Sequence, residues 1–125
     1  MVVWSKSHHR SQNDSEPMTE QEKLAITEAL AAIIADIWPD AGTSPKYGGQ
    51  MIFTRADDPL SCIGGYFVYS GHVSLEFSQG AQLVNSPTVL EGTGKHRRHI
   101  KLKCLDDVQK RGCKNFLVRA AEIAA

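Results

Sequence analysis

The sequence has few cysteines, few aromatic residues and no excess of either charge. Its three cysteines, Cys62, Cys104 and Cys113, include no pair with the C-x-x-C spacing. An odd number without that spacing argues against a disulfide framework and against a thiolate zinc site. The simplest interpretation is a reduced, cytoplasmic setting, because disulfides form mainly in oxidising compartments.

Long apolar runs are also missing. No stretch approaches the ~18 consecutive apolar residues of a membrane-spanning helix, so we expect no membrane segment. Residues 1–15 contain cations and histidines but no apolar segment, and they do not match a secretory signal. The polar composition of residues 1–17 predicts a flexible tail, and residues 18–125 have the length of a single domain.

The zero net charge conceals an uneven distribution. Residues 14–58 contain nine acids and three bases, whereas residues 90–119 contain nine bases and three acids. One interpretation is that the two segments fold against each other. The alternative is that the second segment forms a basic surface that attracts anions.

A helix is predicted after Thr19, because Thr19 and Glu22 have the spacing of a capping box. Apolar residues then recur at helical intervals and define a core-facing side. These residues are Ile26, Leu30, Ile33, Ile34 and Ile37. The helix is expected to end at Trp38-Pro39, because the residue before a proline disfavours the α conformation. Residues 40–45 are expected to form a loop.

Strand character is found in residues 50–55, 63–70, 73–77 and 97–103. The bend at residues 70–72 predicts a hairpin, and Gly64-Gly65 predicts a bulge or a close backbone approach. Near the C-terminus, Asp106 is expected to cap a short helical turn at residues 107–111, which Gly112 breaks. A final helix follows, and together these elements predict an α+β domain. The core-facing residues of that helix are Phe116, Leu117, Ala120 and Ile123.

Residues 90–103 join a glycine-rich bend to a strand in which charged and apolar residues alternate. Successive strand side chains point to opposite faces, so cations lie on one face and mostly apolar residues on the other. The first set is Arg97, His99, Lys101 and Lys103, and the second is Arg98, Ile100, Leu102 and Cys104. On the second face, Arg98 either pairs with a buried carboxylate or closes the bend.

The bend itself is a candidate site for a phosphate-like anion, because its glycines leave backbone N–H groups uncovered beside these cations. The alternative is a tight turn in which the glycines are needed only for their backbone angles. The predicted ligand-binding residues are Gly92, Thr93, Gly94, Lys95, Arg97, Arg98, His99, Lys101 and Tyr47. A Walker A motif is excluded, because Val89 stands where its first glycine is needed and His96 stands where a Ser or Thr is needed.

Catalysis is not expected, because no nucleophile lies in a recognisable catalytic setting. Sequence-specific nucleic acid binding is not expected either, since the basic strand carries no aromatic residue. We therefore predict a non-enzymatic module that binds a small anionic ligand. No cofactor is evident, and the sequence does not indicate an oligomeric state.

Several short elements are shared with a known family. They are Trp38-Pro39, Lys46-Tyr47-Gly48, the strand Gly65 to Phe77, Gly80-Ala81-Gln82-Leu83, Leu90-Glu91-Gly92-Thr93-Gly94-Lys95, Arg98-His99-Ile100-Lys101-Leu102 and Leu105-Asp106-Asp107. Through them, the chain resembles the bacterial YdhG-like family, a domain of unknown function, from about residue 25 to its C-terminus. The resemblance implies an α+β fold in which an N-terminal helix and C-terminal helices pack on an antiparallel sheet of about four to five strands.

Some members of that family are labelled frataxin-like iron chaperones, which gives an alternative function based on surface carboxylates. The carboxylates available for iron are Glu22, Glu28, Asp36, Asp57 and Asp58. Oxygen ligands hold iron only where several converge, and Glu28 and Asp36 are separated by roughly 12 Å along a helix. The alternative therefore requires that other carboxylates meet them in the folded chain.

Overall fold

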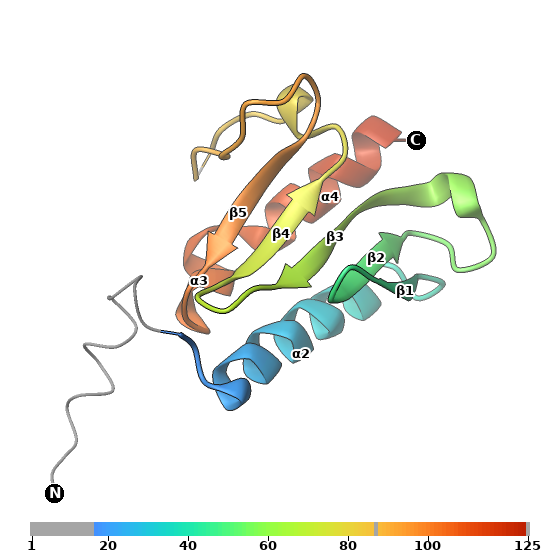
Figure 1. Cartoon of the computed structure of the whole chain (residues 1–125). Helices are drawn as coiled ribbons and strands as arrows, with labels where there is room; N and C mark the ends of the chain where they lie inside the picture. The colour runs from blue at the N-terminus through green and yellow to red at the C-terminus, as the bar shows by residue number, and fades with distance from the viewer. Residues whose placement is uncertain (1–16, 87, 125) are drawn as a thin grey trace, which may run out of the picture.

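An antiparallel sheet of five strands lies at the centre of the computed structural model, which describes residues 17–86 and 88–124 (Figure 1). The strands are β1 (Gly42–Lys46), β2 (Gly49–Phe53), β3 (Cys62–Val68), β4 (Val73–Phe77) and β5 (Arg98–Leu102). Each strand pairs with the next one along the chain, so the order in the sheet is β1-β2-β3-β4-β5. The flexible tail expected at residues 1–17 lies outside the described residues, apart from Pro17.

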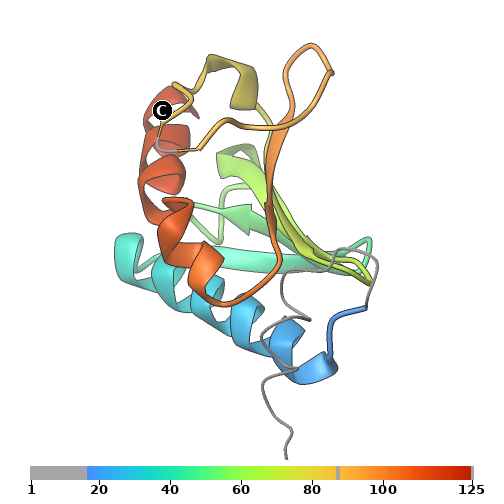
Figure 2. The same cartoon turned by 90° about the vertical axis from the view of Figure 1, so that its left-hand side faces the viewer.

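Helices cover one face of this sheet and leave the other face open (Figure 2). They are α2 (Glu20–Ile37), α3 (Asp106–Lys110) and α4 (Cys113–Ala124), and two short 3-10 turns lie at Pro59–Ser61 and Gly80–Gln82. Buried side chains of α2 and α4, including Leu30 and Phe116, form one core with Leu75 of β4 and Ile100 of β5. This arrangement confirms the α+β prediction. No helix within the described residues is long and apolar enough to cross a membrane.

Helix α2 begins and ends as its sequence predicts. The backbone N–H of Glu22 donates to Thr19 Oγ1 at 3.1 Å, and the N–H of Thr19 donates to Glu22 Oε1 at 2.8 Å. These two hydrogen bonds complete the capping box. At the other end, Trp38 adopts an extended conformation before Pro39.

The loop expected at residues 40–45 was wrong, because this segment forms most of strand β1. Pro45 has no N–H to donate, and β1 accommodates it because the strand lies at the edge of the sheet. A turn at Tyr47 and Gly48 joins β1 to β2, and both residues have positive φ, 52° and 74°. These angles match the tight turns that follow the twist of a hairpin.

The cap expected at Asp106 was also wrong. Leu105 precedes α3 in a helical conformation, and no side chain caps the helix there. The carboxylate of Asp107 instead accepts a hydrogen bond from the backbone N–H of Lys103 at 2.9 Å. The carboxylate one residue further along therefore fixes the connection between β5 and α3. Gly112 ends α3 with a φ of 74°, as expected of a helix-breaking glycine.

Both features predicted for the glycine pair in β3 are present. Ile52 pairs with Gly64 and Phe53 pairs with Cys62, so Ile63 is an extra residue that forms a bulge at the start of β3. A Cβ atom at Gly65 would lie 2.6 Å from the carbonyl oxygen of Gln50 and 2.8 Å from Cζ of Phe67. The ring of Phe67 therefore lies against the backbone on the open face of the sheet, where only glycine leaves room for it.

Candidate functional site

Strand β5 places its side chains as the alternation of its residues predicts. Ile100 and Leu102 are 1% and 0% exposed, which puts them in the core. His99 lies opposite Glu76 and Lys101 lies opposite Ser74 in the pairing of β5 with β4, on the open face of the sheet. The basic stripe predicted from the sequence is therefore present on this face.

Two of the cations in this stripe have carboxylate partners that the sequence did not reveal. Arg97 Nε lies 3.0 Å from Glu76 Oε1, and the hydroxyl of Ser74 donates to Glu76 Oε2 at 3.2 Å. Lys101 Nζ lies 3.8 Å from Glu91 Oε1. These carboxylates partly neutralise the stripe and hold two of its side chains in place.

Arg98 closes the bend, which is one of the two roles that its position allowed. Its Nη1 donates to the carbonyl oxygen of Gly94 at 2.6 Å and to that of Arg97 at 2.7 Å. Both acceptors are neutral, and Arg98 has no carboxylate partner among the described residues. Lys95, on the exposed part of the bend, likewise has none there.

Backbone hydrogen bonds fix the shape of the bend. Glu91 and His99 exchange two hydrogen bonds, of 2.9 and 2.8 Å, and the N–H of Ala81 donates to the carbonyl oxygen of His96 at 2.8 Å. Gly92 has a φ of 132°, a backbone conformation that requires glycine at this position. Gly94 does not have a positive φ, so its backbone conformation does not require glycine. Within the described part of the chain, no backbone N–H of residues 92–97 donates to a protein acceptor.

The electrostatic environment of His72 shows that the positive field extends along the open face. Burial lowers the pKa of His72 first, and the positive charges of Lys101, His99 and Lys103 lower it further. The negative charge of Glu91 raises the pKa of His72, but this effect is the weakest of those named. His72 also stacks on Tyr69 with ring centroids 4.9 Å apart, which fixes its position at the hairpin bend.

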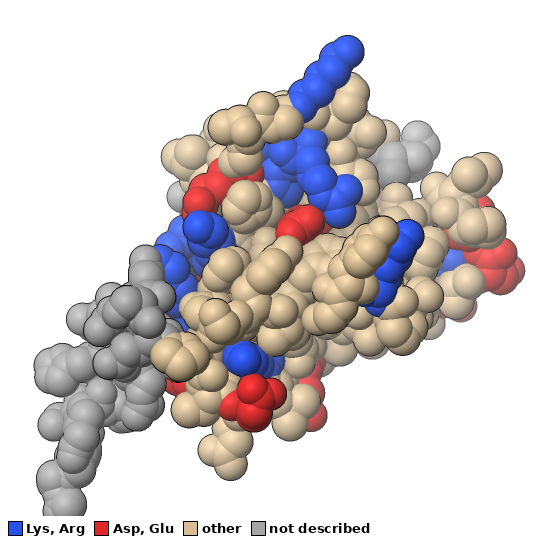
Figure 3. Space-filling view, viewed as in Figure 1, with Lys and Arg blue, Asp and Glu red and all other residues tan. Residues whose placement is uncertain are grey.

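Figure 3 shows the open face of the sheet, with Lys and Arg side chains gathered over β5 and the bend that precedes it. Acidic side chains lie between them, in agreement with the pairs that Glu76 and Glu91 form. The face is therefore a mixed surface with an excess of cations. It combines positive charge with the unpaired N–H groups of residues 92–97, and both features favour anions.

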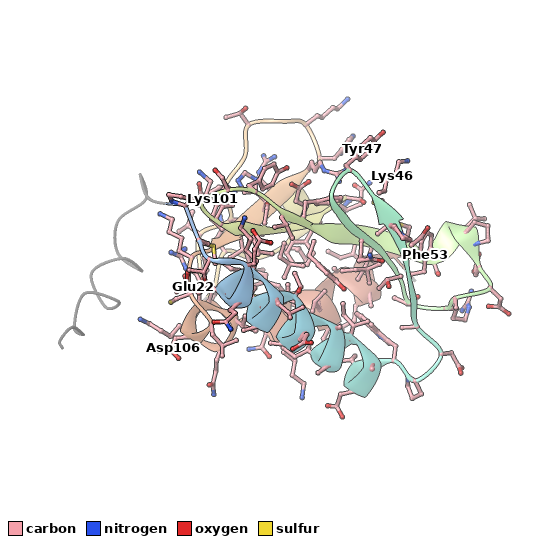
Figure 4. The ribbon with its side chains drawn as sticks, turned by 60° about the horizontal axis from the view of Figure 1, so that its bottom comes forward. Glu22, Lys46, Tyr47, Phe53, Lys101 and Asp106 are labelled. Carbon is pink, nitrogen blue, oxygen red and sulfur yellow. The ribbon has the colours of Figure 1, made fainter. Side chains whose placement is uncertain are left out.

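Tyr47 is separate from the other predicted ligand-binding residues. It lies in the turn between β1 and β2 and is 81% exposed, and β3 and β4 separate this hairpin from β5. Figure 4 shows Tyr47 and Lys46 together at the tip of the hairpin, apart from Lys101. The anion-binding prediction therefore rests on the bend and on β5 alone.

The carboxylates of the iron alternative have different structural roles. Glu22 belongs to the capping box, and Asp36 Oδ2 lies 3.7 Å from Lys114 Nζ. Asp58 accepts from the N–H of Leu60 and pairs with Arg55, and these contacts, in that order, lower its pKa. Across the described chain, no group of three or more His, Cys, Asp or Glu side chains is placed to hold a metal ion. The iron function remains a prediction without a convergent ligand set.

Comparison of the chain with protein-family models, with curated proteins and with solved structures finds no match. The resemblance to the YdhG-like family therefore remains a prediction from the sequence. The functional conclusion rests on the geometry of the bend and of strand β5.

Proposed function

We propose that the protein is a non-enzymatic module that binds a small, phosphate-like anion at residues 92–97 and the neighbouring cations of β5. One observation carries this proposal: the N–H groups of this bend are unpaired within the described chain, next to an arginine that has no carboxylate partner. Successive free N–H groups and a nearby guanidinium are both complementary to phosphate oxygens. The expected cytoplasmic setting would supply phosphorylated metabolites as ligands.

The hydrogen bonds around the bend support a site that is formed before the ligand arrives. Arg98, Ala81 and the Glu91–His99 pair hold the loop from three directions. A loop that is already ordered loses little conformational entropy on binding. Because the bend is exposed, we expect binding to weaken as salt increases, since ions screen exposed charges over ~8 Å at physiological ionic strength.

The experiment is an amide NMR titration with inorganic phosphate at low and at physiological ionic strength. We expect saturable shifts at Gly92, Gly94 and Lys95. The variant Lys95→Gln should weaken binding about two- to fivefold, the range for one exposed charge. The matched control Lys114→Gln removes an exposed cation from α4 and should leave the affinity unchanged.

Two outcomes would contradict the proposal. Linear shifts without saturation would show that the bend is only a turn. Equal weakening by Lys95→Gln and Lys114→Gln would show a general charge effect without a site. A parallel titration with ferrous iron, under reducing and anaerobic conditions, tests the iron alternative. Broadening of the amide resonances around Glu22 or Asp57, without any effect of phosphate, would favour metal binding.

A further inference from the structure

A separate cleft lies on the helix-covered side of the sheet, between α2 and the β1–β2 hairpin. Its volume is about 770 Å³. Glu28 of α2, Thr43 and Gln50 of the hairpin, and Tyr66 of β3 contribute to its lining. Figure 4 looks onto this side of the molecule, with α2 in front and the hairpin beside it. No residue of the anion-binding bend belongs to this cleft.

Tyr66 is the most informative residue of the cleft. The residue is only 6% exposed, yet its hydroxyl has no hydrogen-bond partner among the described residues. Burial raises the pKa of Tyr66, so the hydroxyl stays protonated and keeps its donor. Buried polar groups are nearly always paired with protein or with ordered water, and because Tyr66 lines the cleft, its partner has to come from there. A group bound in the cleft would supply the missing partner.

Three more side chains of the lining are unpaired within the described residues: Glu28, Thr43 and Gln50. Gln50 lies directly opposite Tyr66 in the pairing of β2 with β3, so the two side chains share one face of the sheet. Thr27 differs, because its hydroxyl already donates to the carbonyl oxygen of Leu24 at 3.1 Å. The free polar groups therefore come from both walls of the cleft.

The lining has one acidic and one basic side chain, and the one that lacks a partner among the described residues is the acid, which favours a cation. Glu28 is its one acidic side chain and has no cationic partner among the described residues. Lys46 is its one basic side chain, and its Nζ lies 5.1 Å from the centroid of the Tyr47 ring, at the tip of the hairpin. The Tyr47 ring thus already attracts an ammonium group, as the electron-rich face of an aromatic ring does.

We propose that this cleft binds a small organic cation, with its ammonium group toward Glu28 and a hydroxyl or amide group toward Tyr66 and Gln50. The site is opposite in charge preference to the bend on the open face. The two proposals therefore stand on different residues, and one can fail while the other holds.

The test uses choline, which is a small hydroxylated ammonium, and its neutral isostere 3,3-dimethylbutan-1-ol. In amide NMR titrations of the full chain, we expect choline to give saturable shifts at residues 27–31 and 47–50. The neutral isostere should bind at least about tenfold more weakly, because it has no charge for Glu28 and no cation–π attraction. Equal binding of both compounds, or no saturable shift with choline, would overturn the proposal.

Variants separate the roles of the two main residues. Glu28→Gln should weaken choline binding about tenfold, because the attraction between two opposite charges is lost. Tyr66→Phe should weaken it about threefold, consistent with loss of a neutral hydrogen bond to the choline hydroxyl. Asp36→Asn, at an exposed acid on the same helix, is the matched control and should change nothing. The fold does not use the Tyr66 hydroxyl, so Tyr66→Phe should be at least as stable as the natural chain in urea. A marked loss of stability would show that the hydroxyl has a partner in the protein and would contradict the proposal.

Discussion

Tyr47 has a backbone conformation that residues with side chains rarely adopt. Its φ of 52° lies in the left-handed region, where glycine and asparagine are common and bulky residues are strained. Gly48, with a φ of 74°, completes the same turn at no such cost. The turn does not require a tyrosine, and its presence at the rim of the cleft fits a role for the ring in binding.

Substitution at this turn should therefore have opposite effects on stability at its two positions. Tyr47→Asn should raise the free energy of unfolding by about 0.5–1 kcal/mol, because strain in the folded state is relieved. Gly48→Ala should lower it by about 1 kcal/mol, because a Cβ is added in the left-handed region. Urea denaturation measures both values. Destabilisation by Tyr47→Asn would show that packing of the ring outweighs the backbone strain.

His72 connects the charge of the open face to the pH dependence of stability. Burial and the nearby cations lower its pKa below the ordinary value of 6.5, so the unfolded chain binds this proton more readily than the folded chain. Stability is therefore complete above the unfolded pKa and is lost as the pH falls through the folded pKa.

We expect the natural chain to lose more stability than His72→Gln when the pH falls from about 7.5 to about 5.5, either side of the ordinary histidine pKa. Urea denaturation at both pH values gives the difference for each protein. His96→Gln is a suitable comparison, because it removes a histidine whose charge is not among those acting on the pKa of His72. If the natural chain and His72→Gln lost the same free energy of unfolding between the two pH values, His72 would be excluded as the source of the pH dependence.

At the scale of elements, strand β3 depends on close backbone contacts. Phe67 is only 4% exposed although it lies on the open face, because its ring packs over the glycine at position 65. Sequence reasoning predicted a bulge or a close approach there, but not which ring would cover the backbone. Gly65 and Phe67 share a face because they lie two residues apart on one strand, whereas the register between β2 and β3 brings the carbonyl oxygen of Gln50 against the same glycine.

Gly65→Ala should destabilise the protein by about 2–4 kcal/mol, because the new Cβ would overlap with the backbone of β2 and with the Phe67 ring. Gly94→Ala is the matched control, since a Cβ there meets no heavy atom within 4 Å. Its effect should stay within about 0.5 kcal/mol. Thermal and urea denaturation measure the stability of both variants. Similar losses of stability would contradict the conclusion that a Cβ is crowded at position 65 and has open space at position 94.

At the scale of the whole molecule, packing of helices on the sheet encloses Cys113 completely. The residue is 0% exposed at the start of α4, and burial raises the pKa of its thiol to about 12. Cys62 and Cys104 are partly exposed, and all three cysteines are free. The three thiols therefore differ in access, because the thiolate is the reactive form and reagents must reach it.

With an aromatic disulfide reagent, we expect Cys62 and Cys104 to react in the folded protein and Cys113 to react only through global unfolding. The rate at Cys113 should rise with urea in parallel with the unfolded fraction. The variant Cys113→Ala identifies the slow phase by removing it. Rapid reaction at Cys113 in the absence of denaturant would show that α4 opens locally.

Charge separation along the chain only partly predicted the charge distribution of the folded molecule. The acidic and basic segments do meet, because Asp36 and Lys114 lie 3.7 Å apart, but both side chains are exposed. The carboxylate that holds Arg97 is Glu76, which belongs to neither segment. Sequence counts therefore indicated the basic surface but not the acids that partly neutralise it.

The sequence by itself determined the features that depend on near neighbours along the chain. Thr19 and Glu22 cap α2 because they lie three residues apart, and Ile100 and Leu102 enter the core because strand side chains alternate. Only the tertiary structure decided which distant groups meet. Sheet register places Glu76 beside Arg97, and packing of α2 near the hairpin forms the cleft and leaves the Tyr66 hydroxyl unpaired within the described residues. These contacts follow from the balance of burial and pairing over the whole domain, which no local pattern encodes.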